Sequence, residues 1–267
     1  MEEQGTKTAK TFYPHLVIPP NKKPNRFYAF PFFGLLIKLI ILIPVFIESI
    51  VLAIAFPFVL LIAWFVVQFT GKYWDPGYRF FIGVMRFSTK ISVFIYGLSD
   101  KYPGFSLKTD GHFALDMPKP AHPNKWLAIP ILGFIVRFIL LVPYQIFSQV
   151  LSNGSSLAMI ISWFTVLFKK SFPESLYEFE HDTLRVSLAQ TAYLVGLSDK
   201  YPSFSISMNH QNVKIALIIA GALLTAYNWN DSLQEDKKTY RNNNYEYQYE
   251  YENPQKNRDS MSEINSY

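Results

Sequence analysis

The chain has 267 residues, half of them hydrophobic and 17% aromatic, with a formal net charge of +5 at pH 7 and no cysteine. The absence of cysteine excludes disulfide bonds and thiolate metal sites. Apolar residues are concentrated in long blocks, whereas the stretch after residue 230 is almost wholly polar. This distribution indicates a membrane protein with a polar tail.

Two copies of one unit make up most of the chain. Residues 24–107 return without a gap as residues 123–206, an offset of 99 positions, and the longest identical run is Gly-Leu-Ser-Asp-Lys-Tyr-Pro at 97–103 and 196–202. Each unit therefore needs only one structural explanation. We divide the chain into a polar arm (1–11), repeat 1 (12–107), repeat 2 (108–207), a short apolar helix (208–229) and an acidic, Tyr- and Asn-rich tail (230–267).

Each repeat begins with a long apolar block, at about 31–69 and about 130–168. These blocks are nearly twice as long as the roughly 20 residues that cross a bilayer core as a helix. We therefore predict a helical hairpin in each block, with turns at 53–57 and at 152–156, where Asn153-Gly154 favours chain reversal. The second arm of each hairpin is short, so a re-entrant hairpin is an alternative to a full span.

Basic residues set the expected orientation. They precede the first block and lie between the blocks, whereas the expected hairpin tips carry none. By the positive-inside tendency, the N-terminus and the segments between the blocks face the cytoplasm. The two copies then share one orientation about an axis along the membrane normal.

An amphipathic helix is predicted after each block, at about 76–98 and about 174–197. In repeat 1, Arg79, Arg86 and Lys90 fall on one face of this helix. Such a face suits a helix that lies at the membrane interface with its cations toward anionic lipid headgroups. The alternative is a helix packed within the protein, with its charges satisfied there.

Four cations of these helices are the candidate lipid- or partner-binding residues. Arg86 and Arg185 occupy aligned positions and are the members of this face that keep their sign in both copies. Each of these two arginines could pair with the aspartate of the turn that follows its helix. Alternatively, each could be a solvated side chain. The candidates are Arg79, Arg86, Lys90 and Arg185.

The shared Gly-Leu-Ser-Asp-Lys-Tyr-Pro turn is interpreted as structural. Its glycine suits a left-handed helix cap, its serine and aspartate can accept bonds from nearby amides, and its proline keeps the preceding residue extended. The residues expected to define the turn are Gly97, Asp100, Tyr102, Pro103, Gly196, Asp199, Tyr201 and Pro202.

A small sheet is expected between the copies. Asp110-Gly111 separates two short alternating runs, 105–108 and 113–116, and this is a strong hairpin signal. At the repeat offset, the second run matches 13–18 and the first matches 203–207. We predict a pseudo-symmetric cytoplasmic sheet of up to four strands.

The C-terminal part differs from the repeats. Residues 213–227 are apolar but short for a span, so this helix either crosses with the help of snorkelling and aromatic anchors or lies along the bundle. The polar tail is expected to be disordered. The alternative is that its alternating tyrosines add a strand to a partner's sheet.

Catalytic and metal-binding motifs are missing. The sequence has no Gly-rich phosphate loop and no GxSxG or HExxH motif. Glu180, His181 and Asp182 are consecutive, and consecutive helical residues point in different directions, so no metal site is expected. We predict no enzyme activity, no cofactor, no metal and no nucleic-acid partner.

Several features of the unit resemble a known family. These are the Trp-Phe pairs at Trp64 and Trp163, the Phe-Thr-Gly-Lys-Tyr exit at 69–73, the arginine-bearing helix and the Leu-Ser-Asp-Lys-Tyr-Pro ending. Residues 12–208 resemble the bacterial membrane family catalogued as domain of unknown function 4389, although repeat 2 departs at its exit (168–172). The resemblance implies this architecture and a bacterial inner-membrane location, and it carries no function over to the chain.

The expected fold class is an all-α membrane protein with tandem helical-hairpin repeats, amphipathic interfacial helices and a small cytoplasmic β-sheet. We expect a non-enzymatic, multi-pass protein that is an accessory or scaffolding subunit of a larger membrane complex or organises anionic lipid. Its partners would be anionic membrane lipids and other membrane protein subunits. The alternative is a small transporter or channel between the repeats. The polar residues open to such a pathway are Lys38, Glu48, Gln68, Arg137, Gln145 and Gln149.

Overall fold

The computed structural model describes residues 14–109 and 113–252, with side chains described up to residue 241. The predictions for the N-terminal arm, the Asp110-Gly111 turn and the end of the tail lie outside the described residues. The chain divides into two compact units, Met1–Ala222 and Leu223–Tyr267. The first unit contains both repeats and the first part of the last helix, and its fold is the one that positions the site.

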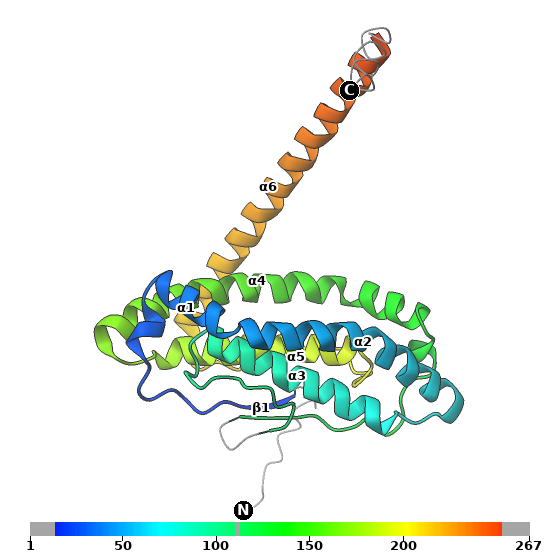
Figure 1. Cartoon of the computed structure of the whole chain (residues 1–267), viewed down its shortest axis with the longest axis horizontal. Coiled ribbons are helices and arrows are strands. Elements are labelled where there is room, and N and C mark those ends of the chain that lie inside the picture. Colours follow the sequence, from blue (N-terminus) through cyan, green and yellow to red (C-terminus); the bar gives the residue numbers. More distant parts are fainter. Residues whose placement is uncertain (1–13, 110–112, 253–267) are drawn as a thin grey trace, which may run out of the picture. The chain divides into compact units, whose positions relative to one another are not determined.

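Each repeat consists of a short 3-10 turn, a long apolar stretch of helix and an amphipathic helix that runs back along it (Figure 1). The predicted helices at 76–98 and 174–197 correspond to the two amphipathic helices. In repeat 1 the elements are η1 (Arg26–Ala29), α1 (Phe33–Ile41), α2 (Ile43–Thr70) and α3 (Asp75–Ile95). In repeat 2 they are η2 (Trp126–Ala128), α4 (Leu132–Lys169) and α5 (Glu174–Leu194), and α6 (Gln211–Glu252) follows.

The expected hairpin turns inside the apolar blocks are wrong. α4 continues without interruption through residues 152–156, and α2 continues through Pro57. Gly154 serves a close approach instead of a turn, since a Cβ there would lie 2.8 Å from the Leu217 carbonyl oxygen. Ser156 Oγ donates to a carbonyl oxygen one turn earlier at 3.1 Å, so a polar side chain is satisfied within the helix. The local sequence at 152–156 favours a turn, but this stretch is helical and packs closely against a segment that is distant in sequence.

Both apolar stretches begin in the same strained way. Phe32 has φ 62° and ψ −55°, and its counterpart Ile131 has φ 64° and ψ −57°, values that non-glycine residues rarely adopt. Two positions later, Gly34 and Gly133 pack so closely on the preceding turn that a Cβ would lie 2.4 Å from a carbonyl oxygen in either copy. This geometry folds the preceding segment back toward the turn that ends the repeat.

A two-stranded antiparallel sheet joins the repeats. β1 (His15–Val17) pairs with β2 (Ala114–Asp116), with Leu16 opposite Leu115. These leucines occupy aligned positions of the two repeats, so the pair lies on the pseudo-twofold axis that relates them.

The strands are exchanged between the repeats. The Tyr78 hydroxyl of α3 donates to the Met117 carbonyl at 2.6 Å, just after β2. Its counterpart in α5, the Tyr177 hydroxyl, donates to the Ile18 carbonyl, just after β1. Each amphipathic helix therefore holds the strand that belongs to the other copy.

The sheet has fewer strands than the four allowed by the sequence. Residues 105–108 and 203–207 form no strand. The Lys90 ammonium donates to the Ser106 and Lys108 carbonyls at 3.2 and 2.8 Å, and the Lys214 ammonium donates to a carbonyl of the second segment at 2.8 Å. Lysine side chains thus take up backbone carbonyls that a neighbouring strand would otherwise bind.

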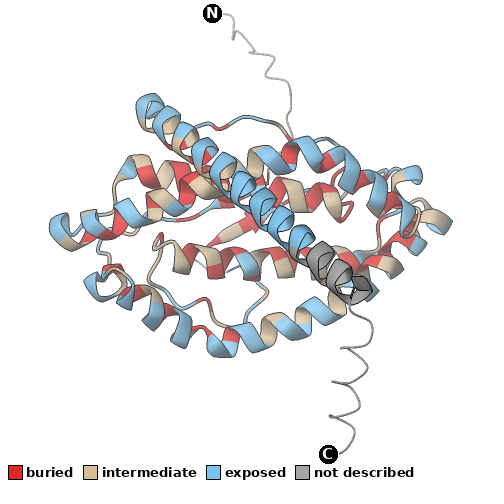
Figure 2. Cartoon of the chain, turned by 90° about the horizontal axis from the view of Figure 1, so that it is seen from above, coloured by how far each residue is buried: buried red, intermediate tan, exposed pale blue. Residues whose placement is uncertain are grey.

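The repeats form three layers. In each repeat the long apolar helix packs on its amphipathic helix, α2 on α3 and α4 on α5, and the strand β1 lies on the far side of these pairs (Figure 1). Figure 2 shows buried residues gathered toward the middle and exposed residues along the outer sides of the helices. The largest buried cluster joins both copies through Trp64, Phe81, Leu115 and Leu188.

In the part of the chain that the structure describes, three helices are long and apolar enough to cross a membrane: Ile43–Thr70, Leu132–Lys169 and Gln211–Arg241. The chain is mostly helical with one small sheet, as the sequence predicts. α6 differs from the expectation, because it continues to Glu252 and includes the first part of the tail that was expected to be disordered. Good helix formers such as Leu233, Gln234, Glu235 and Lys237 follow the apolar part and favour this extension.

Candidate functional site

Each repeat buries a cation of its apolar block, and these two cations occupy aligned positions. Lys38 of α1 is 2% exposed and Arg137 of α4 is 1% exposed. A buried charge is unfavourable unless it is paired and hydrogen-bonded. We call the partners around each cation its cage.

The Arg137 cage engages all three guanidinium nitrogens. Nη1 donates to the Tyr193 and Ser198 carbonyls at 2.7 and 3.1 Å, and Nε donates to the Leu127 carbonyl at 3.1 Å. Nη2 donates to the Asp199 carboxylate at 2.5 Å. The guanidinium carbon also lies 5.1 Å from the centre of the Tyr193 ring, a cation–π distance.

The Lys38 cage is sparser. The ammonium donates to the carbonyl of Ile95, the last residue of α3, at 3.1 Å. It lies 5.8 Å from the Tyr28 ring centre and 5.5 Å from the Phe94 ring centre. Burial lowers the pKa of Lys38 to about 8, against the opposing effect of the Asp100 charge.

The aspartate of each turn binds the segment that precedes the apolar helix. The Asp100 carboxylate accepts from the Asn25 amide N–H at 2.7 Å and from the Asn21 side chain at 2.9 Å. The Asp199 carboxylate accepts from the Asn124 amide N–H, also at 2.7 Å. The possible pairing of these aspartates with the helix arginines is therefore wrong. The segment before each apolar helix folds back, and its asparagines bind the aspartates in place of the arginines.

The cages tie together three segments that are distant in sequence. In each repeat the cation comes from the apolar helix and binds a carbonyl at the C-terminal end of the amphipathic helix. The turn aspartate pairs directly with Arg137 and acts on Lys38 through its charge. A cation at a helix C-terminus is also favoured by the helix dipole. The polar groups are used within the chain, so the arrangement is suited to holding the fold rather than to catalysis.

The sequence contains a signal for these cages. Lys38 and Arg137 are cations at aligned positions inside blocks that carry almost no other charge. From the sequence they are predicted only as polar groups open to a transport pathway. Alignment of the two copies by charge would have marked them as a shared structural feature.

The family model for Domain of unknown function (DUF4389) matches residues 34–106 and, separately, residues 132–205, which together exceed half of the chain. The chain belongs to the DUF4389 family. It contains two tandem copies of the domain, as the sequence features indicate. No curated protein and no solved structure matches the chain. Each DUF4389 copy includes its cation, the carbonyls at the end of its amphipathic helix and its turn aspartate.

Most cations of the predicted basic face in the first DUF4389 copy bind other parts of the same chain. Arg86 Nε donates to the Leu115 carbonyl at 2.9 Å, and its Nη2 pairs with Asp116 at 2.7 Å. Lys90 is buried and binds the loop carbonyls described above. Arg79 is exposed. The alternative interpretation of this helix, in which its charges are satisfied within the protein, therefore applies to Arg86 and Lys90.

Arg185 has a different environment from Arg86. Its Nη1 donates to Asp182 at 3.3 Å and to the Ser207 hydroxyl at 3.2 Å. The contact that Arg86 makes with β2 is replaced in the second copy by His181, whose Nε2 lies 3.1 Å from the Leu16 carbonyl of β1. The structure therefore does not give the two arginines a shared role.

A surface pocket of about 230 Å³ lies beside Arg185. Burial would raise the pKa of Asp182, but hydrogen bonds from His181 and Ser207 and the Arg185 charge hold it below its usual value. Burial opposes the same change at Glu178, where bonds from His210 and Asn209 hold the pKa low. Within residues 14–109 and 113–241, no three His, Asp or Glu side chains are grouped so that they could hold a metal ion.

Glu180 is a buried carboxyl group in the second copy. The Ser155 hydroxyl donates to one of its oxygens, and the other has no hydrogen-bond partner among the described residues. Burial raises the pKa of Glu180 to about 8, and the Ser155 hydrogen bond opposes this shift. The aligned residues in the first copy are Phe56 and Phe81, whose ring centres are 5.1 Å apart.

The turn residues lie where a structural role places them. Gly97 and Gly196 have φ of 79° and 81°, the left-handed values of a helix cap. Pro103 and Pro202 are buried. The Tyr201 hydroxyl donates to a carbonyl of α4 at 3.1 Å, and Tyr102 is partly exposed.

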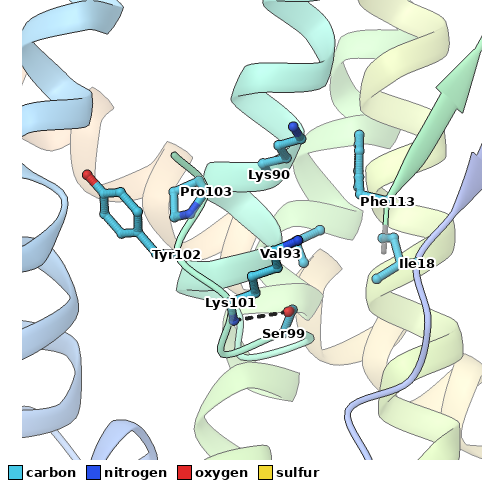
Figure 3. Close-up of a pocket in the computed structure, with 8 residues that line it drawn as sticks. All are labelled: Ile18, Lys90, Val93, Ser99, Lys101, Tyr102, Pro103 and Phe113. Atoms are coloured by element: carbon cyan, nitrogen blue, oxygen red, sulfur yellow. Dashed lines mark hydrogen bonds between the residues drawn. The ribbon is translucent and has the colours of Figure 1, made fainter. Parts of the chain in front are cut away.

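A small cavity adjoins the first of these turns. Figure 3 shows Tyr102 and Pro103 at its edge, with Lys90 of α3 and Phe113 nearby. The Lys101 amide donates to the Ser99 hydroxyl at 3.1 Å, so the turn is braced from within. At about 30 Å³ the cavity has room for little more than a water molecule.

Proposed function

We propose that this DUF4389 protein is a non-enzymatic membrane protein that embeds its layer of apolar helices in lipid and acts as an accessory or scaffolding subunit of a larger membrane complex. The observation that carries the proposal is a continuous apolar face on α1, α2 and α4, directed away from the middle layer. Soluble monomers rarely expose apolar patches of this extent. Exposed members of the face include Leu36, Ile40, Ile47, Ile54, Phe65, Ile135, Ile139, Ile146, Ile161 and Phe168.

The layered fold favours helices that lie in the plane of one leaflet over helices that stand upright. α4 has 38 residues, which at about 1.5 Å per residue makes it roughly 57 Å long, almost twice the hydrocarbon core of about 30 Å. A helix of this length with an exposed apolar side throughout suits an in-plane position.

The sheet supplies a second argument for the in-plane position. β2 packs against the middle of α3, where Arg86 pairs with Asp116. The Asp116 side chain is 66% exposed. If α2 and α3 stood upright in the bilayer, this carboxylate would face lipid near the midplane, where charges are strongly disfavoured. With the layer flat, the sheet lies on the water side.

Cations at the edge of the apolar layer support contact with anionic headgroups. Arg26, Lys72, Lys125, Lys169 and Lys170 are exposed and lie near the two ends of the long helices. Cations at both ends of the long helices are expected if both ends of the apolar layer face the cytoplasm. We therefore propose that the N-terminus and the sheet face the cytoplasm, and the family resemblance supports a location in the bacterial inner membrane.

A transport pathway between the repeats receives less support. Most of its candidate polar groups, Glu48 excepted, are used within the protein. Lys38 and Arg137 lie in their cages, and the Gln68 side chain donates to the Lys125 carbonyl. The Gln145 side chain accepts from Gln190. These bonds leave little polar surface for a solute.

Purification of the full chain from its own membranes in a mild detergent tests the accessory role. We expect a membrane protein partner to remain bound at a fixed stoichiometry, together with anionic lipid, and both to be identified by mass spectrometry. A chain that purifies alone and monodisperse, without a partner or anionic lipid, would contradict the proposal.

A further inference from the structure

The first part of α6 covers one flank of repeat 2. A Cβ at Gly221 would lie 2.2 Å from the Val150 carbonyl oxygen and 2.8 Å from the Gly154 amide nitrogen. The backbones of α6 and α4 thus touch at a crossing of two glycines, as in close helix pairs of membrane proteins. Leu217, one turn earlier in α6, is buried in a cluster with Leu151.

The aligned flank of repeat 1 carries no such helix. On α2, Glu48, Val51, Leu52 and Ala55 take the places of Phe147, Val150, Leu151 and Gly154. Leu151 is fully buried in repeat 2, whereas its counterpart Leu52 is only partly buried. Val51, the neighbour of Leu52, is 62% exposed. The chain explains the difference: after the repeat 1 turn it leads into β2, whereas after the repeat 2 turn it leads into α6.

This flank has the shape and polarity of a helix-binding surface. A cavity of about 350 Å³ lies beside it, between α2 and α3, with Leu52, Phe56, Phe87 and Ile91 in its lining. The two serine hydroxyls of the cavity donate to carbonyls of their own helices. Ala55 is small enough to let another backbone approach. We call this surface, made by Glu48, Val51, Leu52 and Ala55 with the adjoining cavity, the repeat 1 groove.

Glu48 contributes to the groove a carboxylate oxygen without a hydrogen-bond donor among the described residues. One of its carboxylate oxygens is buried and has no hydrogen-bond partner among the residues that the structure describes. It replaces Phe147, which packs with the cluster that holds α6 in repeat 2. An unpaired carboxyl group in an apolar setting is unfavourable until a donor reaches it. A partner of this surface should therefore bring a donor to Glu48.

We propose that the repeat 1 groove binds an apolar, membrane-crossing helix of another protein, which packs on α2 as α6 packs on α4 and directs a lysine, an arginine or another hydrogen-bond donor at Glu48. The proposal rests on the accessory role proposed above and names the surface that performs it. A second copy of this chain fits less well, because Leu217 and Gly221 of its α6 are already buried in its own repeat 2.

Photocrosslinking in the native membrane tests the groove. A photoreactive side chain is placed at Val51 in the full chain, and the matched control is placed at Ile50. The two residues are adjacent in α2 and are 62% and 60% exposed, but they lie about 100° apart around the helix, with Ile50 turned away from the groove. We expect Val51 to crosslink to one apolar helix of a different protein and Ile50 to give lipid adducts.

Two further variants connect the crosslink with the groove. Ala55→Trp blocks the close approach, and Glu48→Leu removes the acceptor while keeping the surface apolar. We expect each to reduce the Val51 crosslink by about tenfold, the factor that corresponds to about 1.4 kcal/mol of binding free energy. An unchanged melting temperature shows that the variants still fold, as expected for two positions that are only partly buried.

The outcomes separate the groove from the accessory role. A Val51 crosslink to a second copy of this chain, or to lipid alone, overturns the groove proposal. If a stoichiometric partner still co-purifies in that case, the accessory role stands and the groove alone is refuted. If no partner co-purifies, both proposals fail. A crosslink that persists undiminished in Ala55→Trp also overturns the groove.

Discussion

The two cation cages solve the same problem with unequal means. In repeat 2, Arg137 makes four hydrogen bonds to its cage and pairs directly with Asp199. In repeat 1, Lys38 makes one hydrogen bond, while Asp100 binds asparagine groups instead. A guanidinium has five donors in a planar fork, and an ammonium is a compact charge with three. The architecture thus tolerates either cation, but repeat 2 is the more tightly locked copy.

The same asymmetry continues outside the cages. Repeat 2 has its flank covered by α6, whereas repeat 1 has the open groove. Repeat 2 also buries Ser155 and Glu180 where repeat 1 packs two phenylalanines. The comparison shows that repeat 2 is the more fully covered copy, whereas repeat 1 leaves open the surface that we propose for a partner.

Removal of the Arg137 side chain should have the largest effect. Arg137→Met leaves the Asp199 carboxylate and buried carbonyls without their donor, and we expect the free energy of unfolding to fall by about 3–5 kcal/mol. Denaturant unfolding in detergent, followed by tryptophan fluorescence, measures the change. Arg137→Lys, which places the repeat 1 cation in repeat 2, should lie between the wild type and Arg137→Met. Equal stability of all three proteins would break the comparison.

The second largest effect concerns Glu180. Its pKa is raised from 4.5 to about 8 in the folded protein, so the folded chain binds more protons than the unfolded chain between these values. Stability is then fully present below about pH 4.5 and is lost as the pH rises through about 8. Glu180→Gln should remove this slope, which is at most about 1.4 kcal/mol per pH unit within the window. A slope that is unchanged in the variant would show that another group produces it.

A smaller effect is expected at Lys38. Lys38→Met replaces a sparsely bonded cation by an apolar side chain of similar length, and we expect a loss of about 1 kcal/mol near pH 7, well below that of Arg137→Met. Because burial lowers the Lys38 pKa from 10.5 to about 8, the unfolded chain binds more protons between these values. The stability of the wild type relative to the variant should therefore rise with pH over this window. A loss as large as that of Arg137→Met would contradict the ranking of the two cages.

The smallest effect on stability is expected at Arg79. The side chain is exposed, and Arg79→Ala should change the free energy of unfolding by less than about 0.5 kcal/mol. Arg86→Ala is the matched comparison, because this arginine binds β2 and its removal should destabilise the protein measurably. Equal losses for the two variants would show that Arg79 has a structural role like that of Arg86.

The repeat made much of the architecture predictable. The aligned prolines, glycines and the shared turn locate the apolar stretches and the amphipathic helices, because these features depend on local backbone requirements that recur in both copies. The left-handed glycines Gly97 and Gly196 are of this kind.

Features that depend on distant packing were not predictable in the same way. Asn153-Gly154 favours a turn locally, but α6 packs against Gly154 and keeps α4 straight through it. The possible arginine–aspartate pairing failed because the preceding segment folds back to bind Asp100 and Asp199 first. The cages could have been found, since Lys38 and Arg137 are aligned cations in apolar blocks, but the carbonyls that bind them are fixed only by the tertiary fold.

The depth of α4 in a bilayer tests the central claim most directly. Because the chain has no cysteine, single cysteines can be placed at Ile135, Ile146 and Ile161, which are exposed positions toward the start, middle and end of the helix. A fluorescent label at each site, quenched by lipids brominated at known depths, reports the depth in reconstituted vesicles. The in-plane account predicts similar depths within one leaflet, with a label at Asp116 in water. A profile with Ile146 deepest and the two ends on opposite sides of the bilayer would contradict it.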